Sequence, residues 1–436
     1  MTEVIGIISQ LVIFLLVFSF PFQPKKLNHL LSLKKNTLNY IDAHALNIIF
    51  FIYLAIIFSF ANLDLKTLFK FHIIISFIFF VVNFKEIRSC IKKFDKFIFF
   101  IFLLIVSSIF FYISQNLKLE WDGHHWIEKA VVFFNGSNIE EISKVKVHPH
   151  YPHVGSYIWA YFWKNSLLEL EYLGRFFQSY FYVVSIFLLL NLLKRLSDNL
   201  KVLFLLFIIL ITFEPYLFAG YQEYLIFSSL IIALRFINLI NFNNHLNYKI
   251  IIFILLIFYT LCWFKDEGLI YYLIFSSTLI FFLNSPTKNK ILFVILLIFL
   301  WVVQYLLQKY LIGIYDFPQK ISLAEIYNDL INIKIFITKI YKITLHILIS
   351  FIKYPLWLLS IFSIIGLIFL KVKLDKTLQY YLSCLFFNIG FIYAIFFTFK
   401  NLDFFLKVSL DRLLFQTSGF YLIFLILILN KIKKIR

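Results

Sequence analysis

Apolar runs of about twenty residues follow one another along almost the whole chain, and only short charged breaks separate them. A helix of this length and composition can cross the hydrocarbon core of a bilayer. Of the 436 residues, 62% are hydrophobic, 15% are charged and 59 are Phe. A membrane β-barrel is excluded, because its strands alternate apolar and polar residues and need only about ten of them. The sequence therefore predicts an all-α, polytopic transmembrane helical bundle.

We expect about 13 spans and two longer segments that do not cross the membrane. The spans are expected near residues 3–22, 44–61, 68–84, 97–115, 168–193, 202–219, 223–241, 249–264, 268–284, 290–310, 354–371, 377–397 and 412–430. The first run lacks a basic start and a small-residue cleavage site, so we expect a retained span and not a signal peptide. The longer segments are 116–167, a large loop after span 4, and 311–353. Charges at near-helical spacing predict interfacial amphipathic helices near 317–350, with two further spans as the alternative.

Lys and Arg are concentrated in alternate connections, which indicates the orientation of the chain in the membrane. The strongly basic connections are 25–35, 85–96, 194–201, 371–376 and 431–436. All of them lie in the cytoplasm if the N-terminus is outside, and most of the acids then lie outside. We expect a multi-pass protein of a bacterial inner membrane whose active site faces the periplasm. Cytoplasmic Lys and Arg account for the net charge of +18, so no nucleic-acid partner is expected.

The first long segment concentrates polar chemistry in two motifs, LEWDGHHWIEKA at 119–130 and HPHYPHVGSYIW at 148–159. Asp122 and Glu120 form a close pair of carboxylates, and five of the ten histidines lie in this segment. Imidazole and carboxylate suit zinc or manganese, so His124 and His125 could hold a divalent metal. No histidine pair here has the helical i, i+4 spacing of a zinc protease, however. The alternative is a solvated loop anchored by interfacial aromatic residues.

Four further motifs place ionisable residues on the same predicted face. They are LGRFF at 173–177, AGYQEYLIF at 219–227, KDEGL at 265–269 and DRLLFQTSGFYLI at 411–423. Ionisable groups near a bilayer are costly to hold and mark function by default. The alternative for any one of them is a snorkelling side chain or an ion pair at a helix end.

Taken in order, these motifs resemble those of the GT-C superfamily of membrane glycosyltransferases. That superfamily includes the protein O-mannosyltransferases and the aminoarabinose transferases, which take sugars from polyprenyl-phosphate carriers. The resemblance covers about residues 97–430, so 97–436 is expected to form a GT-C-like transferase domain. Residues 1–96 are expected to be a three-span N-terminal extension.

The resemblance implies an enzyme that moves a hexosyl or pentosyl unit from a polyprenyl-phosphate donor to a lipid or glycan acceptor. Asp122 would be the general base, with Glu120 as its neighbour. The donor phosphate would be bound by Lys265, Arg412 and Arg175. The substrate-binding residues would be Glu223, Glu267, His124, Tyr151 and Trp126. No cofactor is certain, and a divalent metal stays open.

Two alternative functions are kept. An O-antigen polymerase or ligase is also polytopic and uses polyprenyl substrates, but such enzymes rely on Arg-rich periplasmic loops and the 116–167 segment contains no Arg. A secondary transporter usually has spans broken by Gly and Pro and charges near the midplane. This chain has only 11 Gly and 8 Pro, and its charges lie at predicted span ends.

Overall fold

The computed structural model describes residues 2–34, 37–93, 96–146, 148–193, 196–214, 218–240, 242, 247–313, 323–369, 371, 374–399 and 401–435. Helices account for all the regular structure in these ranges, which confirms the predicted all-α class. Clustering of contacts divides the chain into two compact units. Unit 1 contains Met1–Ile240, Asn247–Leu269 and Ile298–Tyr315. Unit 2 contains Asn241–Leu246, Ile270–Leu297 and Asp316–Arg436.

Unit 1 contains most of the helices, and residues 1–96 and 97–240 belong to it together. Its helices are α1 (Thr2–Val17), α2 (Pro24–Leu30), α3 (Tyr40–Phe60), α4 (Leu65–Val82), α5 (Phe84–Lys93), α6 (Lys96–Gln115), α7 (Trp121–Phe134), η1 (Ile139–Lys144), α8 (Val154–Lys164), α9 (Glu171–Leu188), η2 (Leu189–Leu192), α10 (Asp198–Thr212), α11 (Glu223–Ile237), α12 (Tyr248–Tyr259) and η4 (Thr260–Trp263). Two helices, α13 (Asp266–Phe282) and α14 (Thr287–Leu311), have residues in both units.

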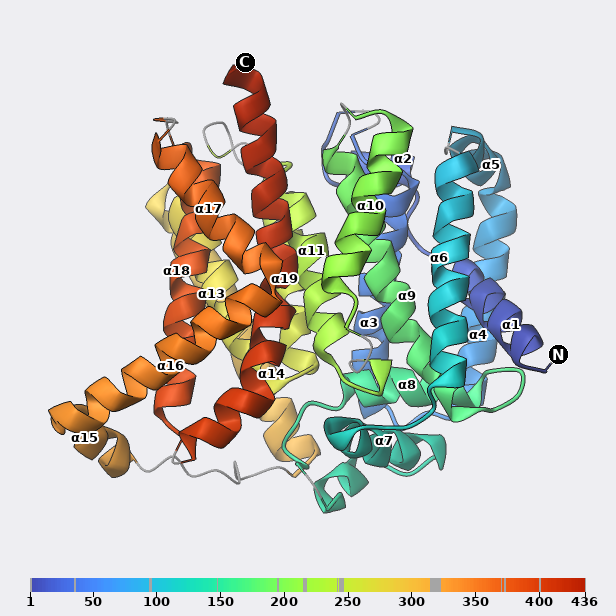
Figure 1. Cartoon of the computed structure of the whole chain (residues 1–436). Helices are drawn as coiled ribbons and strands as arrows, with labels where there is room; N and C mark the ends of the chain where they lie inside the picture. The colour runs from blue at the N-terminus through green and yellow to red at the C-terminus, as the bar shows by residue number, and fades with distance from the viewer. Residues whose placement is uncertain are drawn as a thin grey trace. The chain divides into compact units, whose positions relative to one another are not determined.

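The core of unit 1 is built around α9 and α11, which pack against each other. Every residue of α11 is buried, and so is nearly every residue of α9. The N-terminus of α3 is capped by Asn39 and Asp42, which form a capping box that satisfies two backbone N–H groups. Figure 1 shows α2 and α5 at one end of this unit and α7 and α8 at the other. We call these the α2 end and the α7 end.

Unit 2 is organised around the long helix α19, against which three other helices pack. The helices of this unit are α15 (Leu323–Ile331), α16 (Ile333–Lys353), α17 (Pro355–Phe369), α18 (Lys376–Phe397) and α19 (Leu402–Ile435). Pro355 starts α17 directly after α16 ends, because proline lacks the N–H that a continuing helix would need. In Figure 1, α16 runs obliquely to α18 and α19.

Eight helices in the described part of the chain are long and apolar enough to cross a membrane. Seven of them coincide with predicted spans, and the eighth, α16, lies in the segment predicted to be interfacial. The prediction of helices near 317–350 is confirmed for α15 and α16, although 314–322 lies outside the described residues. The spanning length of α16 agrees with the alternative that this segment contains further spans.

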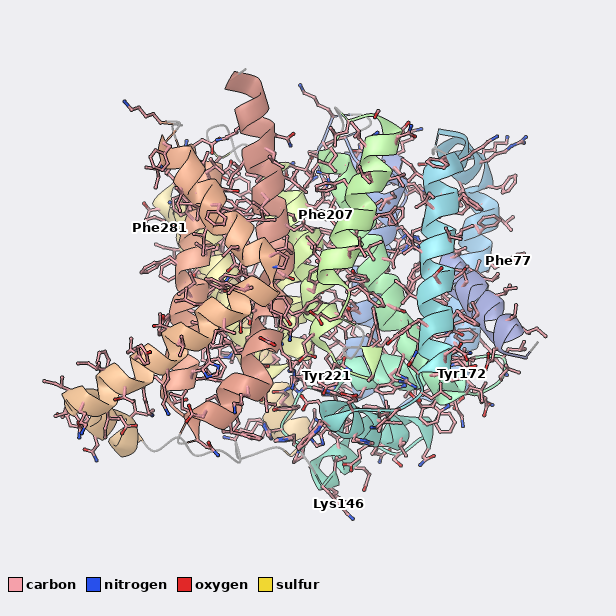
Figure 2. The ribbon with its side chains drawn as sticks, viewed as in Figure 1. Phe77, Lys146, Tyr172, Phe207, Tyr221 and Phe281 are labelled. Atoms are coloured by element: carbon pink, nitrogen blue, oxygen red, sulfur yellow. The ribbon has the colours of Figure 1, made fainter. Side chains whose placement is uncertain are left out.

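The other six predicted spans also fall on helices, but these helices have only 12 to 17 residues. At 1.5 Å per residue, 15 residues extend roughly 22 Å, less than the ~30 Å of the hydrocarbon core. Apolar side chains such as Phe77 and Phe207 are exposed on the sides of unit 1, as expected for surfaces that meet lipid (Figure 2). The structure is therefore that of an α-helical membrane protein.

Candidate functional site

Helix α7 packs directly on the turn that precedes α11, because two glycines leave room for it. A Cβ added to Gly123 would lie 2.1 Å from the carbonyl oxygen of Ala219. Gly220 has a φ of +97°, and a Cβ there would lie 2.8 Å from the Trp159 ring. Only glycine fits both positions without a shift of the backbone or the ring. The central glycine of LEWDGHHWIEKA therefore brings Asp122 close to the segment that carries Glu223.

The residues of that motif lie on different faces of α7. Asp122 is half-buried in the first turn of the helix, and it acts electrostatically on His125 and on His148 of the following segment. By contrast, Glu120 and His124 are exposed. Helical spacing of three or four residues explains the difference, because it puts residues 122, 125, 126 and 129 on one face.

Lys129 lies on this inner face and is completely buried. Its Nζ donates hydrogen bonds to the carbonyl oxygens of Tyr151 at 2.6 Å and Pro149 at 3.3 Å. The ammonium also lies 5.4 Å from the Trp126 ring and 5.8 Å from the Tyr151 ring, and these two rings stack on each other. Burial lowers the pKa of Lys129 to about 7, while the Asp266 carboxylate opposes that shift. Lys129 thus pins the 148–153 segment to α7.

The histidines of that segment form a chain of ring contacts that starts on α7. The ring centroids of His125 and His148 are 4.9 Å apart, and those of His148 and His150 are 5.4 Å apart. Burial is the main cause that lowers the pKa of all three, to about 4 for His150. They are therefore neutral imidazoles at pH 7. For the same reason the 3.7 Å approach of His150 Nε2 to Asp266 Oδ2 is not a charged pair at that pH.

A second cluster forms where α11 and α13 begin. The Lys265 ammonium lies 2.9 Å from Glu223 Oε1 and 3.7 Å from Glu267 Oε1. The side chains of Lys265 and Glu223 are 3% and 0% exposed, so water screens their attraction little. Gly268 allows this arrangement, since a Cβ there would lie 2.0 Å from the carbonyl oxygen of Leu261.

Asp266 connects the two clusters. Burial, together with the neighbouring Glu267, raises the pKa of Asp266 to about 7, while Lys129 and Lys265 act to lower it. A third of its side chain remains exposed, so solvent still reaches the carboxyl group. Lys265 also acts on His148, which Asp122 influences from the other side. The two clusters thus form one site at the α7 end of unit 1.

The site contains buried polar atoms without a hydrogen-bond partner among the described residues. They include both amide atoms of Gln222 and the indole N–H group of Trp126. Gln222 packs tightly against α8, because its Oε1 lies only 1.8 Å from the position that a Cβ on Gly155 would take. An unpaired buried donor or acceptor costs about 1–3 kcal/mol, and each such group in a native protein calls for an explanation. Groups that bind a ligand would have this property.

The other two predicted phosphate ligands are Arg175, which has partners of its own, and Arg412, which belongs to the other compact unit. Arg175 is buried in α9, where it donates to Glu171 Oε2 at 3.0 Å and to the Leu117 carbonyl oxygen at 3.1 Å. Arg412 belongs to unit 2 and is half-buried on α19. That helix begins at Leu402, ten residues before the predicted start of the span, so Arg412 lies inside the helix and not at its outer end.

No group of three or more His, Cys, Asp or Glu residues converges as a metal site within the described ranges. The two histidines considered for a metal point to different surroundings. His124 is exposed, whereas the His125 ring packs edge-on against His148.

The structure adds Lys129, His150, Asp266 and Gln222, which the sequence analysis did not select. Lys129 could have been found, because it lies seven residues after Asp122 and therefore on the same face of a helix. Asp266 and Gln222 sit beside the selected Lys265 and Glu223, but their burial depends on how α7 packs. Sequence spacing gives no sign of that packing.

Comparison with family models, with curated proteins and with solved structures finds no match to this chain. Its function is therefore argued from the residues of the site alone. They offer a half-buried carboxylate, neutral imidazoles, a buried ammonium between carboxylates and stacked aromatic rings. Such a set can accept a proton, stabilise a developing negative charge and bind the face of a sugar ring.

Proposed function

We propose that the protein is a membrane glycosyltransferase that moves a sugar from a polyprenyl-phosphate donor to a lipid or glycan acceptor. In this proposal the membrane is a bacterial inner membrane that the chain crosses about 13 times. The α7 end then faces the periplasm. The transfer requires a base for the acceptor hydroxyl and a cation for the departing phosphate.

The observation that carries the proposal is that Asp122 and Lys265 both act electrostatically on one neutral imidazole, His148. A candidate base and a candidate phosphate ligand therefore belong to one site. They come from α7 and from the turn before α13, which are more than a hundred residues apart in sequence. The arrangement supports a reaction in which negative charge moves from an acceptor oxygen to a leaving phosphate.

Asp122 would remove the proton of the acceptor hydroxyl as its oxygen attacks the anomeric carbon. The bond between that carbon and the phosphate oxygen would break, and Lys265 would stabilise the released polyprenyl phosphate. A positioned general base contributes typically 10²–10⁴-fold to the rate. The partly exposed ring of Tyr151, which stacks on the buried Trp126 ring, would lie beside the sugar, and Glu223 and Glu267 would hold Lys265 in place.

The assignments of Arg175 and Arg412 remain proposals of lower priority. The Arg175 guanidinium already contacts Glu171 and the Leu117 carbonyl, so phosphate would have to compete with Glu171. Lys265 also contacts carboxylates, but it shares a site with Asp122, so we propose it as the principal phosphate ligand. Glu120 and His124, both exposed, would contact an acceptor that approaches from solvent.

The test uses the purified protein in liposomes with a panel of short-chain polyprenyl-phosphate sugars and an envelope lipid extract as acceptor. We expect a labelled glycolipid product from at least one donor. Asp122→Asn should lower the rate by at least about 100-fold without changing expression or folding. Glu140→Gln, in the exposed part of η1, is the matched control.

Two results would contradict the proposal. One is full transfer by the Asp122→Asn protein. The other is uptake of labelled solute into the liposomes with no transfer from any donor, which would indicate a transporter. Comparing envelope glycolipids of cells with and without the gene would then identify the donor sugar and the acceptor together.

A further inference from the structure

A cavity lies at the α7 end of unit 1, at the far end of α7 from Asp122; we call it the hollow. Its volume is about 320 Å³, which is within the size range of small-molecule sites. It is lined by the turn between α3 and α4 (58–65), the end of α7 and the turn after it (133–137), Tyr157 of α8 and Lys164. Twelve residues at 1.5 Å each separate Asp122 from Phe134, roughly 18 Å along the helix.

The lining of this hollow includes a buried hydroxyl group that has no hydrogen-bond partner among the described residues. Tyr157 is 2% exposed, lines the hollow, and its hydroxyl makes no hydrogen bond to any described residue. Burial raises the pKa of Tyr157 above its usual value, so the hydroxyl keeps its proton and can donate. Leaving such a group unsatisfied is unfavourable, and a bound ligand that accepts its hydrogen bond would remove that cost.

The rest of the lining combines an aromatic platform with short polar side chains. Phe134 stacks on Trp163 with ring centroids 4.1 Å apart, and the Lys164 ammonium lies 4.1 Å from the Phe134 centroid. Polar side chains come from both turns and supply donors and acceptors. They are Ser59, Asn62, Asp64, Asn135 and Ser137.

The local electrostatics favour a neutral ligand with hydroxyl groups over an anion. Helices α3 and α7 both end at the hollow and α4 begins there, so the partial negative charges of two helix C-termini outweigh the partial positive charge of one N-terminus. Asp64 adds a full negative charge, although its carboxylate also caps α4 through Thr67. Against these, Lys164 supplies a single positive charge. A phosphate would be disfavoured, whereas hydroxyl groups could donate to the carbonyl and carboxylate oxygens.

We propose that this hollow binds a sugar residue of the acceptor glycan, at a distance from the point of transfer. The inference rests on the proposed glycosyltransferase function and deepens it, because it makes the acceptor a glycan of several residues. It also gives a role to the 1–96 extension, whose α3–α4 turn forms one wall.

The experiment measures binding and not transfer, so it can fail independently of the proposed function. The full chain in nanodiscs is examined by saturation-transfer NMR with methyl hexopyranosides of gluco, galacto and manno configuration. Line broadening of inorganic phosphate in ³¹P spectra is the comparison probe. We expect saturation transfer to at least one glycoside. Phosphate broadening, which the proposed Lys265 site can cause, should be the same in the Tyr157→Phe variant as in the unmodified protein.

Tyr157→Phe removes only the hydroxyl group and should weaken glycoside binding about fivefold, the effect of one neutral hydrogen bond. Tyr161→Phe is the matched control, since Tyr161 is buried on the same helix but its hydroxyl contacts His72. The proposal is overturned if no glycoside binds, if Tyr157→Phe weakens phosphate broadening and not glycoside binding, or if the two Tyr variants bind the glycoside equally.

Discussion

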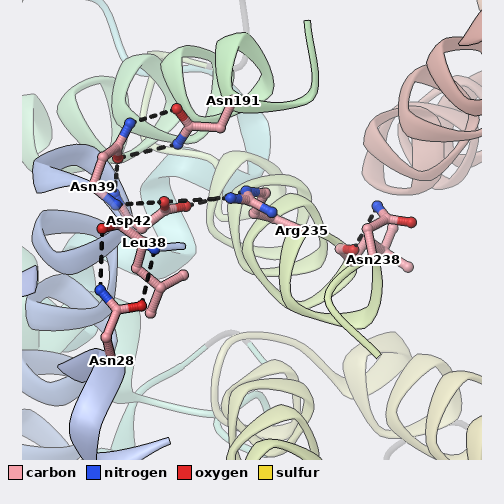
Figure 3. Close-up of polar contacts among 8 residues, drawn as sticks. Asn28, Leu38, Asn39, Asp42, Asn191, Arg235 and Asn238 are labelled. Carbon is pink, nitrogen blue, oxygen red and sulfur yellow. Dashed lines mark hydrogen bonds and ion pairs between the residues drawn. The ribbon is translucent and has the colours of Figure 1, made fainter. Parts of the chain in front are cut away.

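The two ends of unit 1 each bury an acid–base pair, but the pairs have different surroundings. At the α2 end, Asp42 of α3 accepts hydrogen bonds from Arg235 Nε at 3.1 Å, Arg235 Nη2 at 3.4 Å and the Asn39 N–H at 3.0 Å. Figure 3 shows this pair beside Asn39 and Asn191, which bond to each other. At the α7 end, Lys265 lies between two carboxylates and beside a third acid, Asp266.

This contrast distinguishes an ion pair that stabilises the fold from a cluster of polar groups that can bind a ligand or take part in a reaction. The geometry of Asp42 and Arg235 is two-pronged, and the capping box fixes the carboxylate further. At the α7 end, three acids lie around the Lys265 ammonium, so the carboxyl groups outnumber the ammonium group. The amide of Gln222 beside them has no hydrogen-bond partner among the described residues. An incompletely satisfied polar network is costly for stability and is expected where a ligand completes it.

The largest expected effect is on the α2 end. Arg235→Met should lower the free energy of unfolding by about 3–5 kcal/mol, because it leaves the Asp42 carboxylate buried without its cation. Thermal denaturation in detergent would measure the loss. Replacing both partners, as Asp42→Asn with Arg235→Met, should restore much of it, since no uncompensated charge remains. A single variant as stable as the unmodified protein would remove the structural role of this pair.

At the α7 end the matching substitution should cost less. Glu223→Gln should lower the free energy of unfolding by about 1–2 kcal/mol, because Glu267 still faces the Lys265 ammonium and the amide can still accept a hydrogen bond. Transfer activity, measured with the polyprenyl-phosphate donor, should fall much further than stability does. An equal loss of stability in Glu223→Gln and Arg235→Met would erase the distinction between the two ends.

Features that depend on residues close together in the sequence could be predicted, whereas contacts between distant residues could not. The length of the apolar runs predicted the helices. The basic connections 25–35 and 85–96 were predicted to lie on the same side, and α2 and α5 lie at the same end of unit 1. Helical periodicity can place Asp122 and Lys129 on one face. The contact of Gly123 with Ala219 depends on three-dimensional packing, so the burial of Asp266 and Gln222 could not be predicted.

The same reasoning explains the differences found in unit 2. The charges of α16 follow an amphipathic pattern, which predicted an interfacial helix, yet its 21 residues are also long enough to span. Asp403 and Lys407 interrupt the apolar run before Arg412, so the span was predicted to start too late. In the structure Asp403 is paired with Lys342 at 2.7 Å, and α19 continues through these charges.

The two ends should also respond differently to pH. Lys129 has a folded pKa of about 7, below its unfolded value of 10.5, so the unfolded chain binds more protons and stability rises as pH increases from about 7 to 10. Asp266 has the opposite shift, from 3.8 to about 7, so stability falls as pH rises from about 4 to 7. Denaturation midpoints measured across this range should pass through a minimum near neutrality.

Two variants separate these contributions. Lys129→Met should remove the rise above pH 7, and Asp266→Asn should remove the fall below it. Arg235→Met should leave the shape of the pH curve unchanged, because that pair lies at the other end of unit 1. A curve whose shape is the same in all three variants would show that neither group titrates near neutrality.

The smallest effect is expected at the exposed residues of the opening motif. Glu120 and His124 lie outside the inner face of α7, so Glu120→Gln and His124→Ala should leave the denaturation midpoint unchanged. If Asp122 acts alone, the pH dependence of transfer should also be unchanged in Glu120→Gln. If Glu120 raises the pKa of Asp122 in the substrate complex, that variant should shift the acidic limb of the rate profile to lower pH, because the carboxylate repulsion is gone. The pH–rate profile therefore decides between a single base and a coupled pair.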